Sequence, residues 1–426
     1  MTARNVTMEQ IQSTLTAMGE KAVSAARALA VMPPQAKVCC LNYMADEIEA
    51  ARNDIFAANE KDMANGRKNG LSAAMLDRLQ LDDKRLKGMA DGLRQVAAQE
   101  DPVGKVLSSI YRPNGLRIDK VSVPIGVIGI IYESRPNVTV DAAGICLKAG
   151  NAVILRGGSE AFHSNQTLAQ IMNRAGVVCG MPDGAVQLVP WTDRQAVQFL
   201  LKMDQYLDLI IPRGGEGLIR AVVEQSTIPV IKHYKGVCHL FVDRDCDIDM
   251  AVKIIENAKC QRPGVCNALE TLLIDRQIAP EFLPPFLKAM KKHHVELRGG
   301  MEFQKLVPTA LPATEADYFA EYLDYILAVK IVDGVKEAVE HINHYGSRHS
   351  DGILTNRQEN ADYFLAMVDS ATVYHNASTR FTDGGEFGMG AEIGISTDKL
   401  HARGPMGVNE LTSYKYLVRG DGQIRE

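Results

Sequence analysis

Apolar side chains recur every three or four positions through the first hundred residues. The pattern is clearest in EKAVSAARALAVM (residues 20–32) and in AKVCCLNYMADEIEAARNDIFAANEKDM (residues 36–63). This spacing places the apolar residues on one face of an α-helix. The opposite faces carry charged residues, as in helices that cover a core formed elsewhere. The sequence therefore predicts an N-terminal layer of amphipathic helices.

From about residue 120, short apolar runs alternate with segments that can form helices. The runs are IGVIGII (125–131), NAVIL (151–155), AVQLV (185–189), LDLII (207–211) and IPVIKH (228–233). The helical segments between them are VDAAGICLKA, NQTLAQIMNRAG, RQAVQFLLKM and EGLIRAVVEQS. Strands and helices that alternate in this way predict a parallel sheet covered on both faces. Ligands of such sheets bind at the carboxyl ends of the strands.

A second alternating region predicts another α/β domain. Its expected strands lie in GVCHLFVD (236–243), CNALETLLID (266–275), ILAVKIVD (326–333), DGILTN (351–356) and ATVYHN (371–376). Two further β segments fit neither core: VLSSIYRPNGLRIDKVSVP (106–124), with the Pro-Asn-Gly residues of a hairpin turn, and the tail ELTSYKYLVRGDG (410–422). We interpret these two segments as an oligomerisation arm.

Composition and charge narrow the function. A chain of 426 residues is long enough for two or three domains. A net charge of −5, without a concentrated run of Lys and Arg, argues against a nucleic-acid partner and favours a small metabolite. The start of the chain lacks the apolar core of a signal peptide, and the apolar runs fall short of the roughly 20 residues of a membrane helix. We therefore expect a cytoplasmic protein whose eight cysteines are free thiols.

Two glycine-rich turns follow predicted strands and could bind phosphate. PRGGEGLIRAVVEQ (212–225) opens a predicted helix, where free backbone N–H groups favour an anion. ILRGGSEAFHSN (154–165) adds Arg156 beside two glycines. A guanidinium at that place suits a 2′-phosphate and thus NADP rather than NAD. The alternative for both segments is a loop with a surface arginine and no ligand.

The stretch CQRPGVCNALE (260–270) contains two cysteines around an Arg-Pro-Gly turn. A nucleophilic thiolate needs nearby cations or helix N–H groups. Cys266 lies at an element boundary near Arg262 and is the better candidate, whereas Cys260 continues a helical apolar pattern and is expected to be packed. We expect no metal site, because the spacing of the candidates is not that of a zinc site. Those candidates are Cys238, His239, Cys260 and Cys266, and we expect His341, His344 and His349 to cap or pack.

The segment HNASTRFTDG (375–384) contributes Asn376, Ser378, Thr379 and Arg380. Amide, hydroxyl and guanidinium groups of this kind suit a carboxylate or an amino acid, and the alternative is a polar turn after a strand. The glycine-dense FTDGGEFGMGAEIGIST (381–397) indicates a tight loop that approaches a ligand or another part of the backbone.

Four segments together resemble the gamma-glutamyl phosphate reductase family of the aldehyde dehydrogenase superfamily. They are VPIGVIGIIYESRPNVTVDAAGICLKAGNAVILRGGSEAFHSN, IPRGGEG, NAKCQRPGVCNALETLLI and FTDGGEFGMGAEIGISTDKLHARGPMG, in this order. The resemblance implies NADPH-dependent reduction of gamma-glutamyl phosphate (L-glutamate 5-phosphate) to glutamate 5-semialdehyde with release of phosphate. This reaction is the second step of proline biosynthesis from glutamate.

The resemblance also implies an architecture: an α/β fold of the aldehyde dehydrogenase type, with a Rossmann-type cofactor domain, an α/β catalytic domain and a small β arm for oligomerisation. On this basis the NADP-binding domain comprises residues 1–106 and 124–236, the catalytic domain residues 237–404, and the arm residues 107–123 and 405–426. A homo-oligomer is expected. Direct contact with the glutamate kinase that makes the labile acyl phosphate is a further expectation.

The site residues implied by the resemblance begin with Cys266, the cysteine of the QRPxxCN motif, as the nucleophile that forms a thioacyl enzyme. The backbone N–H of Cys266 and the side chain of Asn137 are the expected oxyanion donors. The remaining assignments are Arg156, Gly157, Gly158 and Ser159 near the adenosine ribose and its phosphate; Arg213, Gly214 and Gly215 near the pyrophosphate or nicotinamide ribose; Glu321 at the nicotinamide ribose; and Asn376, Ser378 and Arg380 at the amino-acid end of the substrate.

One departure from the wider superfamily bears on the reaction. Hydrolytic aldehyde dehydrogenases carry a glutamate base where this chain has IKHYKGVCH (231–239), which contains no acid. Loss of a water-activating base favours acyl-phosphate chemistry over hydrolysis. The alternatives are a hydrolytic NAD(P)-dependent aldehyde dehydrogenase, a dinucleotide-binding protein without catalysis, and a metal-binding protein.

Overall fold

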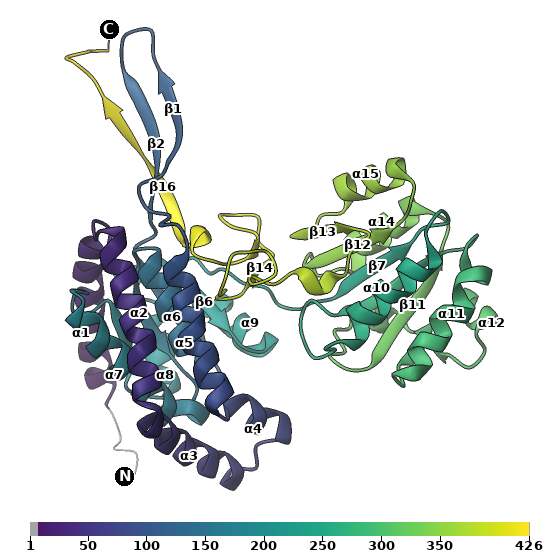
Figure 1. Ribbon diagram of the computed structural model, residues 1–426, viewed down its shortest axis with the longest axis horizontal. Coiled ribbons are helices and arrows are strands. Elements are labelled where there is room, and N and C mark those ends of the chain that lie inside the picture. Colours follow the sequence, from purple (N-terminus) through teal and green to yellow (C-terminus); the bar gives the residue numbers. More distant parts are fainter. Residues whose placement is uncertain (1–6, 426) are drawn as a thin grey trace. The chain divides into compact units, whose positions relative to one another are not determined.

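The computed structural model describes residues 7–425, which form two compact units. Unit 1 contains the chain up to Lys232, Gly388–Gly394 and the C-terminal segment from Met406; unit 2 contains His233–Phe387 and Ile395–Pro405. Figure 1 shows the elements of each unit. Within the described residues, no helix combines the length and the apolar character needed to cross a membrane.

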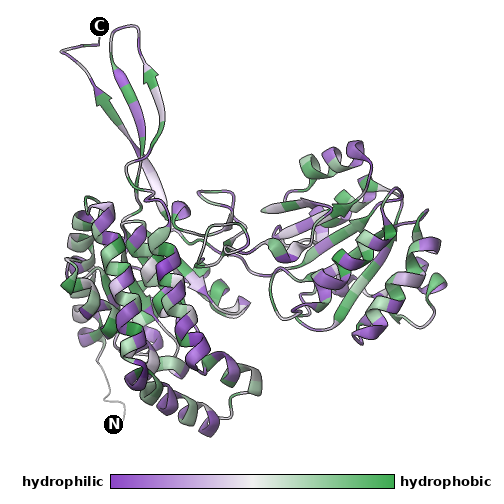
Figure 2. Cartoon of the chain, in the orientation of Figure 1, coloured by the Kyte–Doolittle hydropathy of each residue, from purple (hydrophilic) through white to green (hydrophobic). Residues whose placement is uncertain are grey.

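The N-terminal region of unit 1 is helical, which confirms the prediction from periodicity. Its helices are α1 (Met8–Leu29), α2 (Pro34–Ala50), α3 (Arg52–Lys68), α4 (Ala73–Leu79) and α5 (Asp83–Ala98). Helix α1 begins at a capping box in which Thr7 and Gln10 each accept the other's backbone N–H. Hydrophilic and hydrophobic residues alternate along these helices in Figure 2, and the hydrophobic ones supply the buried faces.

A four-stranded parallel sheet lies in unit 1, with the strand order β5-β4-β3-β6. Its strands are β3 (Val127–Tyr132), β4 (Ala152–Arg156), β5 (Val186–Leu188) and β6 (Leu209–Arg213), and the connecting elements are α6 (Asn137–Lys148), η1 (Ser159–Ala161), α7 (Phe162–Val178), α8 (Arg194–Leu200) and α9 (Glu216–Gln225). The prediction of a strand at residues 228–233 is wrong. Only an isolated bridge joins Val230 to Ile210, because Pro229 has no N–H with which to extend the ladder.

The two β segments that fitted neither core pair with each other, as an antiparallel sheet of β1 (Val106–Tyr111), β2 (Arg117–Pro124) and β16 (Thr412–Arg419). The predicted hairpin is confirmed. The buried Asp119 carboxylate on β2 accepts hydrogen bonds from Ser109 on β1 and from Arg419 on β16, and so ties the three strands together. Both edge strands expose apolar side chains, including Ile110 and Tyr416. The assembly role of this arm stays a prediction.

Unit 2 contains a seven-stranded parallel sheet with the order β10-β9-β11-β8-β7-β12-β13. The strands are β7 (Cys238–Val242), β8 (Leu269–Asp275), β9 (Glu296–Gly299), β10 (Leu311–Pro312), β11 (Ile326–Val332), β12 (Ser350–Leu354) and β13 (Thr372–His375). The helices are α10 (Ile248–Cys260), α11 (Ala279–Lys292), α12 (Met301–Leu306), α13 (Glu315–Tyr318), α14 (Val335–Tyr345) and α15 (Gln358–Met367), with a short η2 (Thr379–Phe381) and a small β14 (Ile395–Ser396) and β15 (Gly404–Pro405) pair. The five strands predicted in this region are confirmed.

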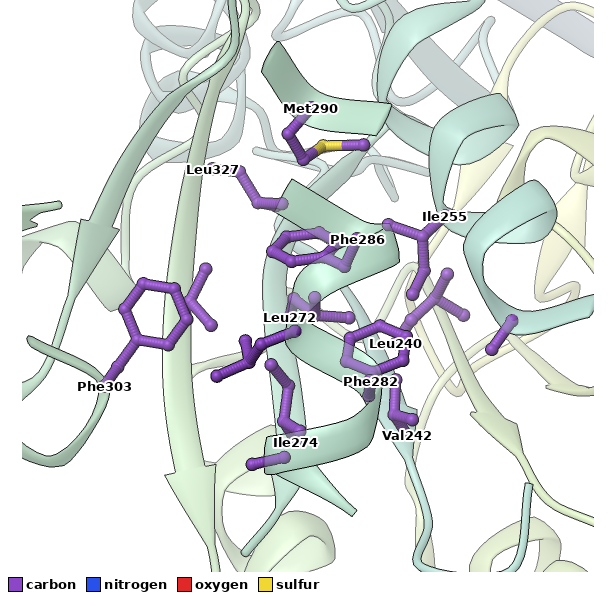
Figure 3. Packing of buried hydrophobic residues seen from close by; sticks show 14 of the residues in the cluster. Leu240, Val242, Ile255, Leu272, Ile274, Phe282, Phe286, Met290, Phe303 and Leu327 are labelled. Carbon is purple, nitrogen blue, oxygen red and sulfur yellow. The ribbon is translucent and has the colours of Figure 1, made fainter. Parts of the chain in front are cut away.

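Adjacent residues of the central strands supply two separate cores. On β7, Leu240 belongs to the cluster that packs against α10, α11 and α12, whereas Phe241 belongs to the cluster beneath α14 and α15. This division follows from the alternation of side chains along a strand. Figure 3 shows the first cluster, in which Phe282 and Phe286 stack with their ring centroids 5.4 Å apart.

A fully buried ion pair joins α10 to β8. The ammonium group of Lys259 lies 2.7 Å from a carboxylate oxygen of Glu270, and neither side chain is exposed. The second carboxylate oxygen of Glu270 accepts the backbone N–H of Leu323 at 3.1 Å. Two charges removed from water hold each other in place, so the loss of one would leave the other unpaired.

We therefore expect Lys259→Met to lower the free energy of unfolding by about 3–5 kcal/mol, because it strands the Glu270 carboxylate in the core. Replacing both members, as Lys259→Met with Glu270→Leu, should cost much less. Urea unfolding followed by circular dichroism measures both. Lys253→Met, on the exposed face of the same helix, is the matched control. Equal stability of the single and double variants would contradict the prediction.

Candidate active site

Cys266 lies in the turn between α10 and β8, three residues before the strand begins. The backbone of Gly236 packs directly on this turn, because a Cβ atom built at Gly236 would come 1.8 Å from the Cys266 carbonyl oxygen. The thiol of Cys238 donates to the same carbonyl at 3.2 Å. The Gly236 N–H is in turn donated to Glu321 at 2.9 Å. The segment that leads into β7 thus fixes the backbone position of Cys266.

Asn267, the next residue, ties the turn to the segment after β13. Its amide donates to the carbonyl of Thr382 at 2.9 Å, and its own carbonyl accepts the hydroxyl of Thr379 at 2.7 Å. Its side-chain oxygen accepts from the guanidinium of Arg380. The structure therefore brings the Cys266 turn together with part of the segment predicted to hold the substrate.

Arg380 supplies a positive charge beside this turn. Its Nε donates to Gln261 at 2.9 Å, and its backbone N–H is capped by the hydroxyl of Ser378 at 3.3 Å. Burial, and secondly the neighbouring Arg262, lower the pKa of Arg380, while Cys266 is among the groups that raise it. An arginine remains protonated at neutral pH despite such a shift. Arg380 can therefore favour a thiolate or bind an anionic substrate group.

Two histidines that sequence spacing does not connect to Cys266 lie beside it. A ring nitrogen of His233, one of His349 and the Cys266 sulfur are all within 4.8 Å of one another. His233 Nδ1 lies 2.8 Å from the carbonyl of Ile395, which can only accept, so Nδ1 carries the proton. His349 is fully buried, and its burial lowers its pKa to about 4, so its imidazole is neutral at pH 7.

Cys266, Cys238 and His349 all lie at or just before the amino ends of their strands, β8, β7 and β12 respectively. Because these strands are parallel and adjacent, with β7 between the other two, their amino ends meet at one edge of the sheet. Sequence reasoning missed His233 and the position of His349, since residues 233, 266 and 349 are brought together only by strand order.

Asn376 has a structural role besides the predicted one at the substrate. Its amide oxygen accepts the N–H of Thr355 and its amide nitrogen donates to the carbonyl of the same residue, both at 2.9 Å. Its backbone has a φ of 52°, a left-handed conformation that asparagine tolerates. Each bond uses one of the two donor or acceptor positions of the amide, so the role of Asn376 at the substrate stays a prediction.

In unit 1, Arg156 ends β4 and donates to the carbonyl of Thr192 at 2.6 Å, while its buried Nε has no partner among residues 7–425. Burial lowers its pKa. A Cβ at Gly157 would come 2.2 Å from the amide nitrogen of Asn165, so packing inside the protein already requires this glycine. The Ser159 hydroxyl donates to Glu160 at 3.2 Å. A Cβ at Gly158 would also meet Glu160, at 2.5 Å.

The start of α9, where phosphate binding was predicted, holds a carboxylate of the chain itself. Glu133, just after β3, accepts the N–H of Gly215 at 3.0 Å, and a Cβ at Gly214 would lie 2.6 Å from that carboxylate. The backbone N–H of Glu133 is donated to the carbonyl of Arg213 at 3.1 Å. The helix N-terminus thus attracts an anion, and an acidic side chain occupies the place.

Asn137 is the first residue of α6, and its amide donates to the carboxylate of Asp141 at 2.9 Å. Burial raises the pKa of Asp141 to about 6, against the opposing effects of Asn137 and Arg213. Asn137 belongs to unit 1 and Cys266 to unit 2, so their cooperation as oxyanion donors stays a prediction.

Comparison with known proteins places this chain among characterised families. The sequence profile of the aldehyde dehydrogenase family matches residues 3–304. The gamma-glutamyl phosphate reductase of Moorella thermoacetica is 56% identical over 96% of this chain and 98% of its own length. That of Halothermothrix orenii is 53% identical over 98% of this chain and 100% of its own.

Solved structures agree with the sequence comparison. The gamma-glutamyl phosphate reductase of Thermotoga maritima superposes with a TM-score of 0.95 at 46% identity, covering 97% of this chain and 100% of that one. An acetylating aldehyde dehydrogenase from Geobacillus thermoglucosidasius shares the fold, with a TM-score of 0.69 at 18% identity over 98% and 99% of the two chains. The expected aldehyde-dehydrogenase-like α/β fold is confirmed. This chain belongs to the aldehyde dehydrogenase family and, within it, to the gamma-glutamyl phosphate reductases.

Proposed function

We propose that this enzyme reduces gamma-glutamyl phosphate to glutamate 5-semialdehyde and releases phosphate, by way of a thioester on Cys266. The observation that carries the proposal is the position of Cys266, in a turn clamped by Gly236 and Asn267 beside the charged Arg380. The relatives' shared name, gamma-glutamyl phosphate reductase, supports the choice of substrate.

In the first step, the Cys266 thiolate attacks the acyl carbon of the substrate. The S–C bond forms and the C–O bond to phosphate breaks, so phosphate leaves with the bonding electron pair. An imidazole of His233 or His349, with a ring nitrogen within 4.8 Å of the thiol sulfur, can accept the thiol proton. Arg380 and Ser378 are proposed to hold the anionic, amino-acid end of the substrate.

In the second step, the thioester carbonyl is reduced and the thiohemiacetal collapses to aldehyde and free thiolate. When bound, the nicotinamide supplies the hydride for this reduction. Negative charge develops on the carbonyl oxygen in each step, and the proposed donors to it are the backbone N–H of Cys266 and the amide of Asn137. A well-placed donor of this kind contributes about 2.7–4 kcal/mol to catalysis.

The aldehyde dehydrogenase family uses a nicotinamide cofactor, and we propose NADPH for this member. The unpartnered Nε of Arg156 suits the 2′-phosphate, next to Gly157, Gly158 and Ser159. Arg213, Gly214 and Gly215 at the start of α9 suit the pyrophosphate once Glu133 has left that position. Glu321 is proposed at the nicotinamide ribose.

Assembly and location remain expectations. The apolar side chains exposed on β1 and β16 support a homo-oligomer formed through the arm. The eight unpaired cysteines suit a reducing cytoplasm. Contact with the kinase that supplies the acyl phosphate is expected from the lability of that substrate.

The mechanism is tested in reverse with glutamate semialdehyde, NADP and inorganic phosphate. We expect the wild type to reduce NADP only when phosphate is present, because phosphate must release the acyl group from the thioester. Cys266→Ala should lose this activity, whereas Cys246→Ala, another partly buried cysteine of unit 2, should keep it. Absorbance of the reduced nicotinamide measures the rate. Turnover that ignores phosphate would instead indicate a hydrolytic aldehyde dehydrogenase.

The close contact between Gly236 and the backbone of Cys266, the proposed nucleophile, is tested by the variant Gly236→Ala. The added methyl group would overlap the Cys266 carbonyl and force the turn to move. A displacement of about 1 Å can lower kcat about 100-fold. Gly264→Ala, in the same turn, is the control, because its Cβ would come no closer than 3.7 Å to the Leu323 carbonyl. Equal rates for the two variants would show that close packing at Gly236 does not position the nucleophile.

The carboxylate at the start of α9 is tested by Glu133→Gln. Removing this charge should favour phosphate at the helix N-terminus and tighten NADP binding by about 2- to 5-fold, which corresponds to about 0.3–1 kcal/mol. Titration calorimetry measures the dissociation constant. Glu224→Gln, an exposed acid near the end of α9, is expected to leave it unchanged. Weaker binding in Glu133→Gln would mean that Glu133 contacts the cofactor favourably.

A further inference from the structure

We propose that His233, Cys266 and His349 form a site that captures a borderline-soft divalent cation such as Zn²⁺ and thereby withdraws the nucleophile from catalysis. The sequence expectation of no metal site covered Cys266, and it expected His349 to cap or pack, so only His233 among the three proposed ligands was outside it. The binding of metal rests on the geometry alone, whereas the inhibition rests also on the proposed function of Cys266.

The three ligand atoms are already close to the separations that a metal requires. Two ring nitrogens and the Cys266 sulfur lie within 4.8 Å of one another. Around tetrahedral zinc, with bonds of about 2.0–2.3 Å, ligand atoms are about 3.3–3.6 Å apart. The separations therefore need to shorten by at most about 1.5 Å to reach those of a tetrahedral site.

The imidazoles are held as metal-binding histidines usually are, with one ring nitrogen bonded to the protein and the other left for the ion. His233 gives its Nδ1 proton to the Ile395 carbonyl at 2.8 Å, which leaves Nε2 as the ring nitrogen with a lone pair. His349 Nδ1 lies 2.9 Å from the Ser350 hydroxyl, which is itself 2.6 Å from the Thr382 hydroxyl. These bonds fix both rings in place.

The Nε2 atom of His349 is a second, independent indication of a ligand. It is buried and has no hydrogen-bond partner in the structure, and the whole residue has no exposed surface. A buried polar atom without a partner destabilises the folded state. Coordination to a metal ion would give this nitrogen the partner that the chain does not supply.

The ligand set selects the class of ion. One thiolate and two imidazoles suit Zn²⁺, Cd²⁺ or Co²⁺, whereas Mg²⁺ and Ca²⁺ prefer oxygen. Three protein ligands leave a fourth position for water. On binding, the S–H bond breaks, an S–metal bond forms and one proton is released to solvent, with no change of oxidation state. Coordinated in this way, the sulfur lone pair is not available to attack the acyl carbon.

The test uses the full-length, metal-free enzyme titrated with Co²⁺, whose thiolate complexes absorb in the ultraviolet through sulfur-to-metal charge transfer. We expect this band to saturate at one Co²⁺ per chain and to disappear when Zn²⁺ competes. Zn²⁺ should also slow alkylation of Cys266 by iodoacetamide, measured by peptide mass spectrometry. A chelator should restore both alkylation and activity, and Mg²⁺ should have no effect.

Three variants identify the ligands. Cys266→Ala should abolish the charge-transfer band. His233→Gln should weaken the affinity at least about tenfold, since even the loss of an outer-shell partner costs 10–100-fold. His344→Gln, an exposed histidine of unit 2, is the matched control and should bind as the wild type does. If the buried His349→Gln variant does not fold, His233→Gln and Cys266→Ala still decide the question.

A charge-transfer band that persists in Cys266→Ala, unchanged affinity in His233→Gln, or no binding at micromolar metal would each overturn the site. Failure of the proposed function has a different signature. In that case the metal would still bind and protect Cys266 from alkylation, but Cys266→Ala would keep full phosphate-dependent activity. Failure of the metal site alone would leave Cys266→Ala inactive and the wild type insensitive to Zn²⁺.

Discussion

The contact between Gly236 and the Cys266 carbonyl is the constraint on which the proposed active site in unit 2 depends. It brings the segment before β7 so close to the turn before β8 that no side chain fits between them. Because β7 and β8 are neighbours in a parallel sheet, the two backbones approach each other at the amino ends of their strands. The sheet itself therefore positions Cys266, the proposed nucleophile, and the Cys266 side chain is left partly exposed.

At the same edge of the sheet, one arginine and two histidines lie around the Cys266 thiol. Arg380 reaches the turn through Asn267, and the two histidines approach from the segments before β7 and β12. A thiol beside an arginine and two imidazoles suits nucleophilic attack and metal capture alike. We infer that reactivity toward the acyl phosphate and sensitivity to zinc arise from one arrangement of side chains.

In unit 1, the Glu133 carboxylate lies at the N-terminus of α9, where we propose that a phosphate of the cofactor binds. The helix N-terminus offers unpaired N–H groups, and Glu133 satisfies one of them. A phosphate that takes this place must displace a carboxylate, which reduces the net gain from binding. The glycines at 157 and 214 are explained at least in part by packing against Asn165 and Glu133.

The sequence by itself determined the helical N-terminal layer, the hairpin, the family, five of the seven strands of the unit 2 sheet and the four strands of the unit 1 sheet, and it singled out Cys266 as the proposed nucleophile. Each of these follows from local periodicity or from a contiguous motif. A strand was wrongly predicted at residues 228–233 because the apolar residues around Pro229 match a strand pattern. That pattern does not take into account that proline has no N–H to donate to the ladder. Only the tertiary structure decided that His233 and His349 accompany Cys266, that Glu133 occupies the start of α9 and that the Asn376 amide is bonded to Thr355. These contacts depend on the order of strands in a sheet and on the direction of side chains, which hydrophobic spacing along one strand does not encode.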